Sequence, residues 1–362
     1  MTDDHAVTVV IPVHQLNRPI QRAVESALAA GRPGQVKVLV VCHGLAANDV
    51  QAQLSGVPQS DIEFLEFADG VPSPAGPRNA GLGRVVTRYV AFLDSDDYLE
   101  GDALSSWIDQ ADSSQADAVV ARMRLQSGSI VRTPRLRLLR VGPLHPVRDR
   151  VAYRTAPLGL LRRSAVERLG IQFTADLRSG EDMEFGLRMW FGGGRIEMGR
   201  AGGSYVVGED AVERVTGGML PLTEEFRALH HVVKAAWLRE LPDRARHAIA
   251  VKLLRVHLLA AMHRRRNGFA WTADDRTALA KAVEALKALA PTVEMPLSIA
   301  ERELLRLAES PQTSLETFAE ALGRWPSGGY RTQIVTPRLR DNLRLESNLR
   351  YYGAEKLVSI RR

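Results

Sequence analysis

The sequence contains a single cysteine, Cys42, among 362 residues. One cysteine excludes an internal disulfide and any cysteine-rich metal site. No apolar stretch approaches the roughly 18 residues that a membrane-spanning helix requires. The first residues, Met1–His5, include two acids and lead straight into an apolar run, which is not the pattern of a signal peptide. These absences favour a cytoplasmic protein with a conventional hydrophobic core.

Acidic residues are scarce in the last part of the chain. Residues 221–362 carry 24 Lys and Arg against 16 Asp and Glu, whereas residues 1–220 carry 24 against 26. The whole positive excess therefore belongs to the C-terminal part. An anionic neighbour, such as a phosphorylated polymer, a membrane surface or nucleic acid, is one explanation. A solvated basic surface is the other.

Apolar, β-branched runs alternate with amphipathic stretches over roughly the first 220 residues. Val7–Val13 and Val36–Val41 are apolar almost throughout, which predicts strands buried on both faces. Between them, Asn17 can cap a helix that carries Pro19 in its first turn. Strands that alternate with helices predict an α/β fold with a mostly parallel, doubly wound sheet.

From about Leu222 this alternation gives way to helical periodicity. The amphipathic stretches cover 222–241, 243–266, 272–290, 298–309 and 313–322. Two have capping-box spacing, Ser298 with Glu301 and Thr313 with Glu316. We therefore predict an α/β domain over 1–220 and a mainly helical accessory domain over 221–323. A basic segment over 324–362 follows, which packs on either domain.

Three carboxylates end the expected strand at Tyr89–Leu93, namely Asp94, Asp96 and Asp97. Ligands of open α/β sheets bind at the carboxyl ends of the strands. Clustered carboxylates repel each other, and a divalent metal that carries a diphosphate is a common partner for them. For an isolated Asp-Ser-Asp-Asp, an exposed turn stabilised by an Asx motif is the alternative.

Four segments, in this order, resemble family 2 glycosyltransferases of the GT-A fold. They are Val10–Val13 with the following helix, Gly76–Gly81 with its Arg78-Asn79 pair, Phe92–Asp97, and Gly180–Asp182 followed by Arg188. The third segment resembles the DxD motif of the family. The resemblance ends near residue 215, and it implies a GT-A catalytic domain over 1–220.

The resemblance implies an enzyme that moves a sugar, with inversion, from a nucleotide diphosphate to an acceptor hydroxyl. It implies that Asp96 binds Mn²⁺ or Mg²⁺, while Asp94 faces the ribose or reaches the metal through water. Such a metal stabilises the charge that gathers on the departing diphosphate. The nucleotide-sugar contacts that it implies are Pro12, Val13, His14, His43, Arg78, Asp94 and Ser95.

The resemblance also places the general base at Asp182, which would take the proton of the acceptor hydroxyl. Glu181 then caps the helix or supports the acceptor. The alternative is that both acids only interact favourably with the helix dipole. Arg78 either contacts the diphosphate or forms a salt bridge with Asp94 or Asp96.

The chain departs from the family pattern at two places. His43 and its neighbours Cys42 and Gly44 stand where acidic residues commonly bind the pyrimidine, so His43 is left to donate to the base or stack on it. Gly208 stands where a histidine commonly helps to bind the metal or diphosphate. Glu209, Asp210 and Arg214 are the nearby substitutes.

We expect transfer of a hexose or N-acetylhexosamine from a UDP-sugar, or another nucleotide sugar, to a carbohydrate acceptor. The basic C-terminal part favours a cell-wall or other anionic or lipid-linked glycan, and peripheral contact with the inner face of the membrane, over nucleic acid. The main alternative is a catalytically degenerate GT-A domain that serves as a binding or scaffold protein. A nucleotidyltransferase is a weaker rival, because its glycine-rich phosphate loop is missing from Pro12–Arg18. The sequence leaves the donor sugar, the acceptor and the oligomeric state open, a homo-oligomer included.

Overall fold

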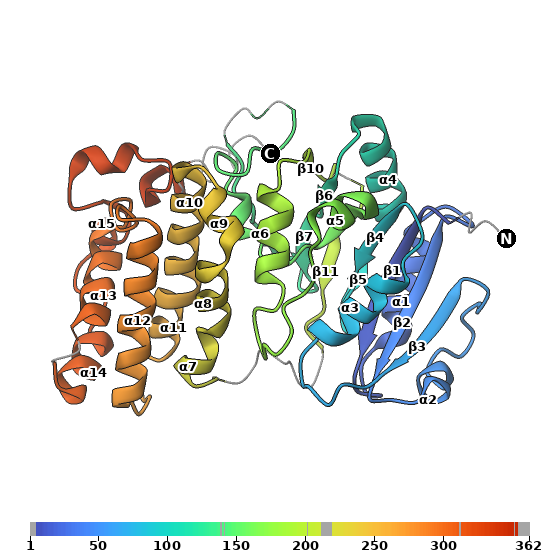
Figure 1. Cartoon of the computed structure of the whole chain (residues 1–362), viewed down its shortest axis with the longest axis horizontal. Coiled ribbons are helices and arrows are strands. Elements are labelled where there is room, and N and C mark those ends of the chain that lie inside the picture. The colour runs from blue at the N-terminus through green and yellow to red at the C-terminus, as the bar shows by residue number, and fades with distance from the viewer. Residues whose placement is uncertain are drawn as a thin grey trace. The chain divides into compact units, whose positions relative to one another are not determined.

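The computed structural model describes residues 5–137, 140, 142–200, 202–210, 219–310, 313–350 and 352–353. The chain folds into two compact units (Figure 1). Unit 1 comprises residues 1–133, 141–144 and 154–218, and unit 2 comprises residues 134–140, 145–153 and 219–362.

A seven-stranded sheet organises unit 1, with the strand order β10-β6-β9-β4-β1-β2-β3. The strands are β1 (Val7–Val13), β2 (Val36–His43), β3 (Ile62–Phe67), β4 (Tyr89–Phe92), β6 (Ala118–Val120), β9 (Gly159–Arg162) and β10 (Ile196–Met198). Strand β9 is antiparallel to both of its neighbours, and every other neighbouring pair is parallel. The predicted α/β fold with a mostly parallel sheet is confirmed.

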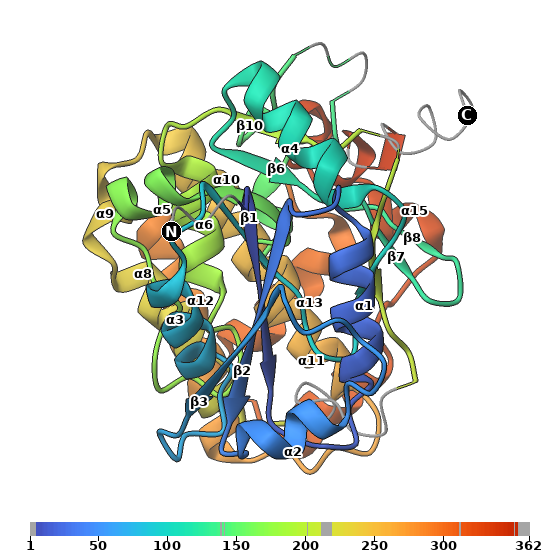
Figure 2. The same ribbon diagram turned by 90° about the vertical axis from the view of Figure 1, so that its right-hand side faces the viewer.

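Six helices accompany this sheet in the described part of unit 1. They are α1 (Ile20–Ala29), α2 (Ala47–Ala52), α3 (Ala75–Arg84), α4 (Ala103–Ser114), α5 (Arg163–Leu169) and α6 (Met183–Phe191). Helices α1 and α3 lie on opposite sides of β1 and β2 (Figure 2). A smaller sheet has the order β5-β11-β7-β8, with β5 (Tyr98–Leu99), β7 (Met123–Leu125), β8 (Ile130–Val131) and β11 (Tyr205–Val207).

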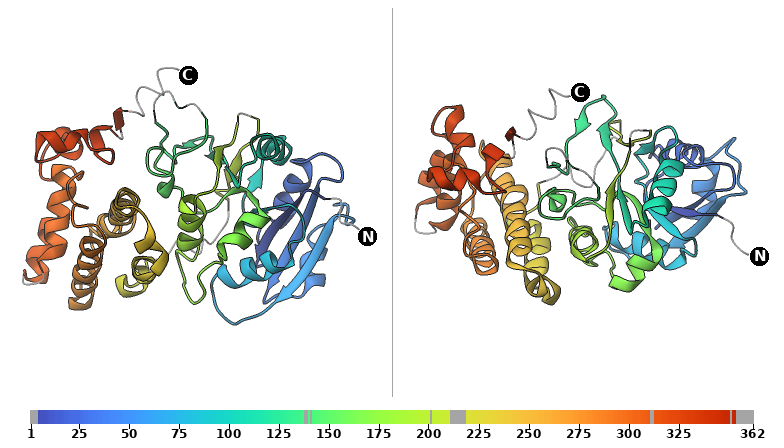
Figure 3. Two further views of the ribbon diagram at one scale, coloured as in Figure 1. Left: turned by 45° about the horizontal axis from the view of Figure 1, so that its top comes forward. Right: turned by 90° about the horizontal axis from the view of Figure 1, so that it is seen from above.

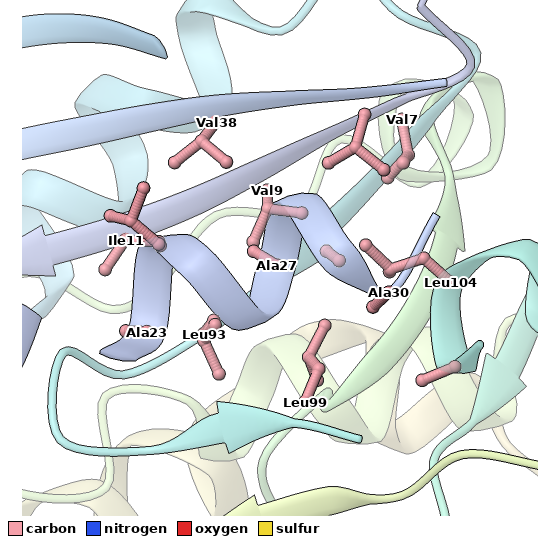
Figure 4. Close-up of a cluster of buried hydrophobic side chains, with 14 of the residues drawn as sticks. Val7, Val9, Ile11, Ala23, Ala27, Ala30, Val38, Leu93, Leu99 and Leu104 are labelled. Atoms are coloured by element: carbon pink, nitrogen blue, oxygen red, sulfur yellow. The ribbon is translucent and has the colours of Figure 1, made fainter. Parts of the chain in front are cut away.

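The core of unit 1 shows why the first strand and helix form where they do. Ala23 and Ala27, one helical turn apart on α1, lie against Val9 and Ile11 of β1 (Figure 4). All four side chains are fully buried. The small alanines let the helix approach the sheet closely, so the end of β1 is held rigidly where the ligand site is expected.

The predicted cap of α1 is wrong. The helix begins at Ile20, with Pro19 at the N-cap position and no side-chain cap. The preceding residues instead form a turn, in which the N–H of Ile20 donates to the carbonyl of Arg18 at 2.7 Å. This turn removes Asn17 from the helix end and buries Arg18.

Unit 2 is helical. Its helices are α7 (Leu222–Glu225), α8 (Arg227–Lys234), α9 (Ala236–Glu240), α10 (Asp243–Leu253), α11 (Ala260–Arg264), α12 (Ala273–Leu289), α13 (Ile299–Glu309), α14 (Leu315–Gly323) and α15 (Tyr330–Ile334). A π-helical stretch, Leu254–Leu259, joins α10 to α11. Helices α12 and α13 pack side by side (Figures 1 and 3). No helix among the residues described here is long and apolar enough to cross a membrane.

Helix starts in unit 2 were predicted with mixed success. The capping box of Ser298 and Glu301 at α13 is confirmed. The cap at Thr313 is wrong, because Ser314 caps α14 and accepts from the N–H of Thr317. The single helix expected over 222–241 is three short ones, interrupted at Phe226 and at Ala235, where the backbone becomes extended.

Three of the cations of residues 221–362 lie in the interior of unit 2. Lys252, Arg265 and Arg276 are 0%, 0% and 3% exposed. Arg265 donates to Glu225 at 2.6 Å, and Arg276 stacks over the ring of Phe318 at 4.0 Å. These side chains are structural. Three acids of residues 221–362, Asp275, Asp341 and Glu346, are buried as well, so burial does not reduce the net positive charge that stays exposed.

Candidate active site

The three carboxylates after β4, those of Asp94, Asp96 and Asp97, lie in one loop, residues 93–97 (the acidic loop), and have different environments. Asp97 is 6% exposed and accepts from the Tyr205 hydroxyl at 2.6 Å and the Gly208 N–H at 2.8 Å. Burial, followed by repulsion from Asp94, raises the pKa of Asp97 above its usual range. The Tyr205 hydroxyl also accepts from the N–H of Asp94 at 3.2 Å. Asp97 therefore anchors the loop from within and leaves Asp94 and Asp96 to face a ligand.

Gly208 has a structural reason to be glycine. An added Cβ would lie 2.0 Å from the carbonyl oxygen of Asp96, closer than any real contact. The backbone at Gly208 therefore approaches the acidic loop where a histidine side chain was anticipated from the family pattern. No larger residue fits at this position unless the loop moves.

Two arginines from the first helix region hold the acidic loop. Arg18 Nη1 donates to Asp96 Oδ2 at 2.6 Å, and its side chain is only 7% exposed. Arg22, on α1, donates to the backbone carbonyl of Asp96 and forms a two-pronged ion pair with Asp210. Asp96 is thus neutralised by a guanidinium on one of its two oxygens.

Arg78 joins the acidic loop to the start of α6. Its two terminal nitrogens donate to Asp94 Oδ1 at 2.6 Å and to Glu181 Oε1 at 2.8 Å. The guanidinium also lies over the ring of Phe173 at 5.3 Å. Burial alone would lower the pKa of Arg78, but Asp94, Glu181 and Asp182 outweigh it and raise that pKa. Arg78 is therefore a permanent cation surrounded by acids and an aromatic ring.

Glu181 and Asp182 divide their roles by burial. Glu181 is 7% exposed and sits on Arg78, and burial followed by the Asp182 charge raises the pKa of Glu181. Asp182, at the N-cap position of α6, is half-buried and influences both Arg78 and Glu181 electrostatically. Glu181 consequently supports Arg78, while Asp182 is the more accessible acid of the pair.

The carboxyl end of β1 brings His14 into the same group. Partial burial and the Arg18 cation lower the pKa of His14, with His43 adding to this effect and Asp96 opposing it. A neutral imidazole is therefore favoured between the ends of β1 and β2 and the acidic loop. Pro12 is half-buried and Val13 is buried at the same end of β1.

An acid does lie near the end of β2, although none stands there in the sequence, because Asp69 follows the neighbouring strand β3. His43 Nε2 lies 2.8 Å from Asp69 Oδ1, and the His43 ring lies beside Phe67 at 5.8 Å between centroids. Asp69 follows β3, which is parallel to β2, so the two strand ends meet at one edge of the sheet. Partial burial opposes ionisation of Asp69, but hydrogen bonds from the Val71 N–H and His43 lower its pKa.

The remaining predicted residues have varied positions. Ser95 is 5% exposed, which places it inside the acidic loop rather than on its surface. Glu209 accepts from the N–H of Ser127 at 2.6 Å, and Asp210 pairs with Arg22. Arg214 lies outside the described residues.

Sequence reasoning missed Arg18, Asp69 and Tyr205. All three contact their site partners across long stretches of sequence, as with the 78-residue separation of Arg18 from Asp96. Asp69 left one usable signal, since it is an acid just after a buried strand next to β2. For Arg18 and Tyr205 the sequence gives no such signal, because the role of Arg18 depends on the turn before α1 and that of Tyr205 on the smaller sheet.

The acidic loop fits a divalent cation only in one way. Its donors are the hard carboxylate oxygens of Asp94 and Asp96. Within the described ranges, no group of three or more His, Cys, Asp or Glu side chains is arranged to hold a metal. Mg²⁺ sites of the nucleotide type use one or two carboxylates and complete the shell with phosphate oxygens. The residues therefore suit a cation shared with a diphosphate, not one held by the protein alone.

Comparison with known proteins identifies the α/β unit. Residues 8–170 match the family described as "Glycosyl transferase family 2". Those residues belong to that family. The matched range includes β1, α3 and the acidic loop, so the family 2 domain contains most of the site described above.

Relatives and solved structures agree with this assignment. The chain is 29% identical, over 58% of its length, to the succinoglycan biosynthesis protein ExoO of Rhizobium meliloti. It is 20% identical, over 70% of its length, to a poly(ribitol-phosphate) beta-glucosyltransferase of Bacillus spizizenii. The chain spans 63% and 39% of the lengths of these two relatives.

The crystal structure of Staphylococcus aureus TarS 1-349 in complex with UDP-GlcNAc has the same fold. The TM-score is 0.73 at 18% identity, and the match covers 91% of this chain and 94% of that one. Coverage of this extent includes residues of unit 2 as well as unit 1. The GT-A fold predicted for the first part of the chain is confirmed, and a helical C-terminal part follows it as expected.

Proposed function

We propose that the chain is an inverting glycosyltransferase that uses a nucleotide-diphosphate sugar, with a UDP-sugar as the favoured donor. Membership of residues 8–170 in glycosyl transferase family 2 supports the reaction class. The similarity in fold to TarS, whose crystal structure contains UDP-GlcNAc, supports the choice of nucleotide.

One observation carries the proposal further than the family does. Arg78 contacts Asp94 and Glu181 at once, with Asp182 beside it, so the acidic loop and the candidate base belong to one network. A displacement at the anomeric carbon needs a charged group near the leaving diphosphate and a base near the acceptor. This network contains both.

The residues take distinct roles in the proposed reaction. Asp182 accepts the proton of the acceptor hydroxyl. The oxygen of that hydroxyl forms a bond to the anomeric carbon while the bond from this carbon to the diphosphate oxygen breaks. Arg78 stabilises the nucleotide diphosphate that leaves, and Glu181 keeps Arg78 in place. Asp94 and Asp96 would hold Mn²⁺ or Mg²⁺, which supplies further positive charge to the diphosphate when bound.

The ends of β2 and β3 supply the proposed base site. The pair of His43 and Asp69 presents a polar edge with Phe67 at its side, which suits hydrogen bonding and stacking of a pyrimidine. Pro12, Val13 and His14 would line the ribose and base from β1. Asp69 thus takes the part that acids at the end of β2 commonly have in the family.

The acceptor is proposed to be a hydroxyl on a cell-wall or other anionic or lipid-linked glycan. Two named relatives support this class, a succinoglycan biosynthesis protein and a poly(ribitol-phosphate) beta-glucosyltransferase. The net positive charge of residues 221–362 is compatible with such an acceptor.

The proposal is tested with Asp182→Asn. This variant should bind UDP as the wild type does but lose turnover by about 10²–10⁴-fold, because only the base is removed. The assays are UDP release from a panel of UDP-sugars and calorimetric UDP binding, both with Mn²⁺. Asp109→Asn, an exposed acid on α4, is the matched control and should keep full turnover.

Two outcomes would contradict the proposal. Undiminished turnover by Asp182→Asn would remove it from the base role. Binding of UDP with no transfer or hydrolysis by the wild type, across all donors and acceptors tried, would favour a degenerate domain that serves as a scaffold.

A further inference from the structure

The segment from Tyr330 to Arg350 in unit 2 has its polarity reversed. All of its buried side chains are polar, and four of its large apolar side chains are exposed. The buried polar set is Thr336, Asp341, Asn342, Glu346, Ser347 and Asn348, each at most 6% exposed. Tyr330, Leu339, Leu343 and Leu349 are 66%, 81%, 75% and 47% exposed. Water-facing protein surfaces normally show the opposite arrangement.

Hydrogen bonds satisfy the polar side chains that this segment buries. Asn342 Oδ1 accepts from the Thr336 N–H at 3.0 Å, and the Ser347 hydroxyl donates to the carbonyl of Asn342 at 2.6 Å. Asn348 donates to the carbonyl of Gln333 at 3.0 Å. These bonds hold the 3₁₀ helix Leu339–Leu343 so that its leucines face outward and do not pack in the core of this unit.

The charge exposed on the same segment is mainly of one sign. Residues 330–350 contain five arginines and two acids, Asp341 and Glu346. Both acids are 3% exposed, and Asp341 is paired with Arg344 at 2.7 Å. Arg338 and Arg340, which flank Leu339, are exposed. The outward side therefore combines protruding leucines with positive charge.

We propose that this segment, residues 330–350, is a docking surface for an anionic phospholipid bilayer. Protruding leucines can enter the boundary between head groups and acyl chains, while arginines beside them stay among the phosphates. Positive residues near such a membrane each add to the attraction, which salt weakens. A protein partner would need acids of its own opposite these arginines, whereas any anionic bilayer already supplies negative charge. The proposal concerns unit 2 alone and does not depend on the proposed function.

A second run of arginines in unit 2, Arg264–Arg266, is less suited to lipid head groups. Arg265 is fully buried and Arg264 is paired with Glu225. The arginines beside the exposed leucines are better placed for this role.

Vesicle co-sedimentation of the full chain tests the proposal. Wild type should bind vesicles of phosphatidylcholine and phosphatidylglycerol in equal parts, less at high salt, and should bind phosphatidylcholine alone at least about tenfold more weakly. Leu339→Ser/Leu343→Ser should reduce binding to the mixed vesicles by about tenfold or more, because apolar insertion is lost. Arg338→Gln/Arg340→Gln should give a similar loss, confined to the anionic vesicles.

Val86→Ser, at a position 63% exposed in unit 1, is the matched control and should bind as wild type does. Because Leu339 and Leu343 are exposed, their substitution should leave the melting temperature unchanged, which a thermal scan checks. Binding that is absent, equal on both vesicle types, or unaffected by the leucine variant would overturn the proposal. A wild-type dimer in light scattering that the leucine variant abolishes would also overturn it, since the face would then belong to a second copy.

Discussion

At the scale of single residues, burial separates four acids that sequence alone presents as equals. Asp94 and Asp96 have side chains 38% and 16% exposed, each bonded to an arginine. Asp97 and Glu181 are 6% and 7% exposed and have raised pKa values. Asp94 and Asp96 can therefore bind a ligand, whereas Asp97 and Glu181 hold the surrounding residues in position. This division is why Asp97 is better understood as a structural acid than as a third metal ligand.

The raised pKa of Asp97 makes stability depend on pH. A raised pKa means that the folded state binds the proton more tightly, so this contribution is present below the ordinary value of 3.8. It is lost as pH rises through the raised pKa. Relative to Asp97→Asn, the wild type should therefore lose on the order of 1–3 kcal/mol of unfolding free energy from acidic to neutral pH.

Urea denaturation at a series of pH values measures this difference. Asp109→Asn should change the pH dependence only slightly and with the opposite sign, because the hydrogen bond from Arg32 lowers the pKa of Asp109, which is 56% exposed. A wild type that gains stability relative to Asp97→Asn as pH rises would show that Asp97 is ionised and favourably paired in the folded state.

At the scale of elements, the site depends on backbones that approach each other closely. The β11 end brings Gly208 against the carbonyl of Asp96, and β11 also carries Tyr205 to Asp97. The small sheet therefore determines the shape of the acidic loop that follows β4. A substitution in this sheet can change the ligand site without touching a ligand.

Gly208→Ala tests this dependence. Its Cβ would meet the carbonyl of Asp96 at 2.0 Å, so the loop must shift, and we expect a loss of about 1–3 kcal/mol in unfolding free energy. Weaker UDP binding with Mn²⁺ should accompany it. Denaturant unfolding and calorimetry provide the two readouts.

Gly83→Ala is the matched control, because an added Cβ at this exposed position of α3 has no neighbour within 4 Å. Alanine there should stabilise the protein by about 0.5–1 kcal/mol through its higher helix propensity. Equal effects of the two substitutions would contradict the packing argument at Gly208.

Sequence patterns predicted elements better than they predicted junctions. The strands β1 and β2 follow from nearly continuous apolar runs, whose burial depends little on the rest of the chain. Asn17 and Thr313 were assigned as caps in error, because several nearby polar residues can satisfy a helix end and only tertiary contacts choose among them. The Arg18 contact with Asp96 follows from one such junction, so it was out of reach.

At the scale of the whole molecule, the two units include segments that are distant in sequence. Residues 134–140 and 145–153 belong to unit 2, although most of their neighbours in sequence belong to unit 1. In unit 2, Arg255 joins several of these parts, since it donates to Glu301 at 2.8 Å, the Tyr153 hydroxyl at 3.3 Å and the carbonyl of Glu346 at 2.7 Å. Periodicity along the chain carries no information on such contacts.

Arg255→Ala should strongly destabilise unit 2. It removes the cation that pairs with Glu301 and leaves several partly buried acceptors without a donor, for an expected loss of about 3–5 kcal/mol. Arg246→Ala, which removes a surface ion pair with Asp243, should cost less than about 1 kcal/mol. Thermal unfolding of both variants checks the prediction, and similar melting temperatures would refute it.

The most direct test of the central claim is the melting temperature of the full chain with nucleoside diphosphates, with and without Mn²⁺. A ligand that binds only the folded state must stabilise it, so UDP with Mn²⁺ at a hundred times its Kd should add about 2.7 kcal/mol. We predict this increase for the wild type, a smaller one without Mn²⁺, and none for Asp96→Asn with UDP and Mn²⁺. A wild type that no nucleoside diphosphate stabilises, or an equal increase in Asp96→Asn, would contradict the assignment of the acidic loop as the donor site.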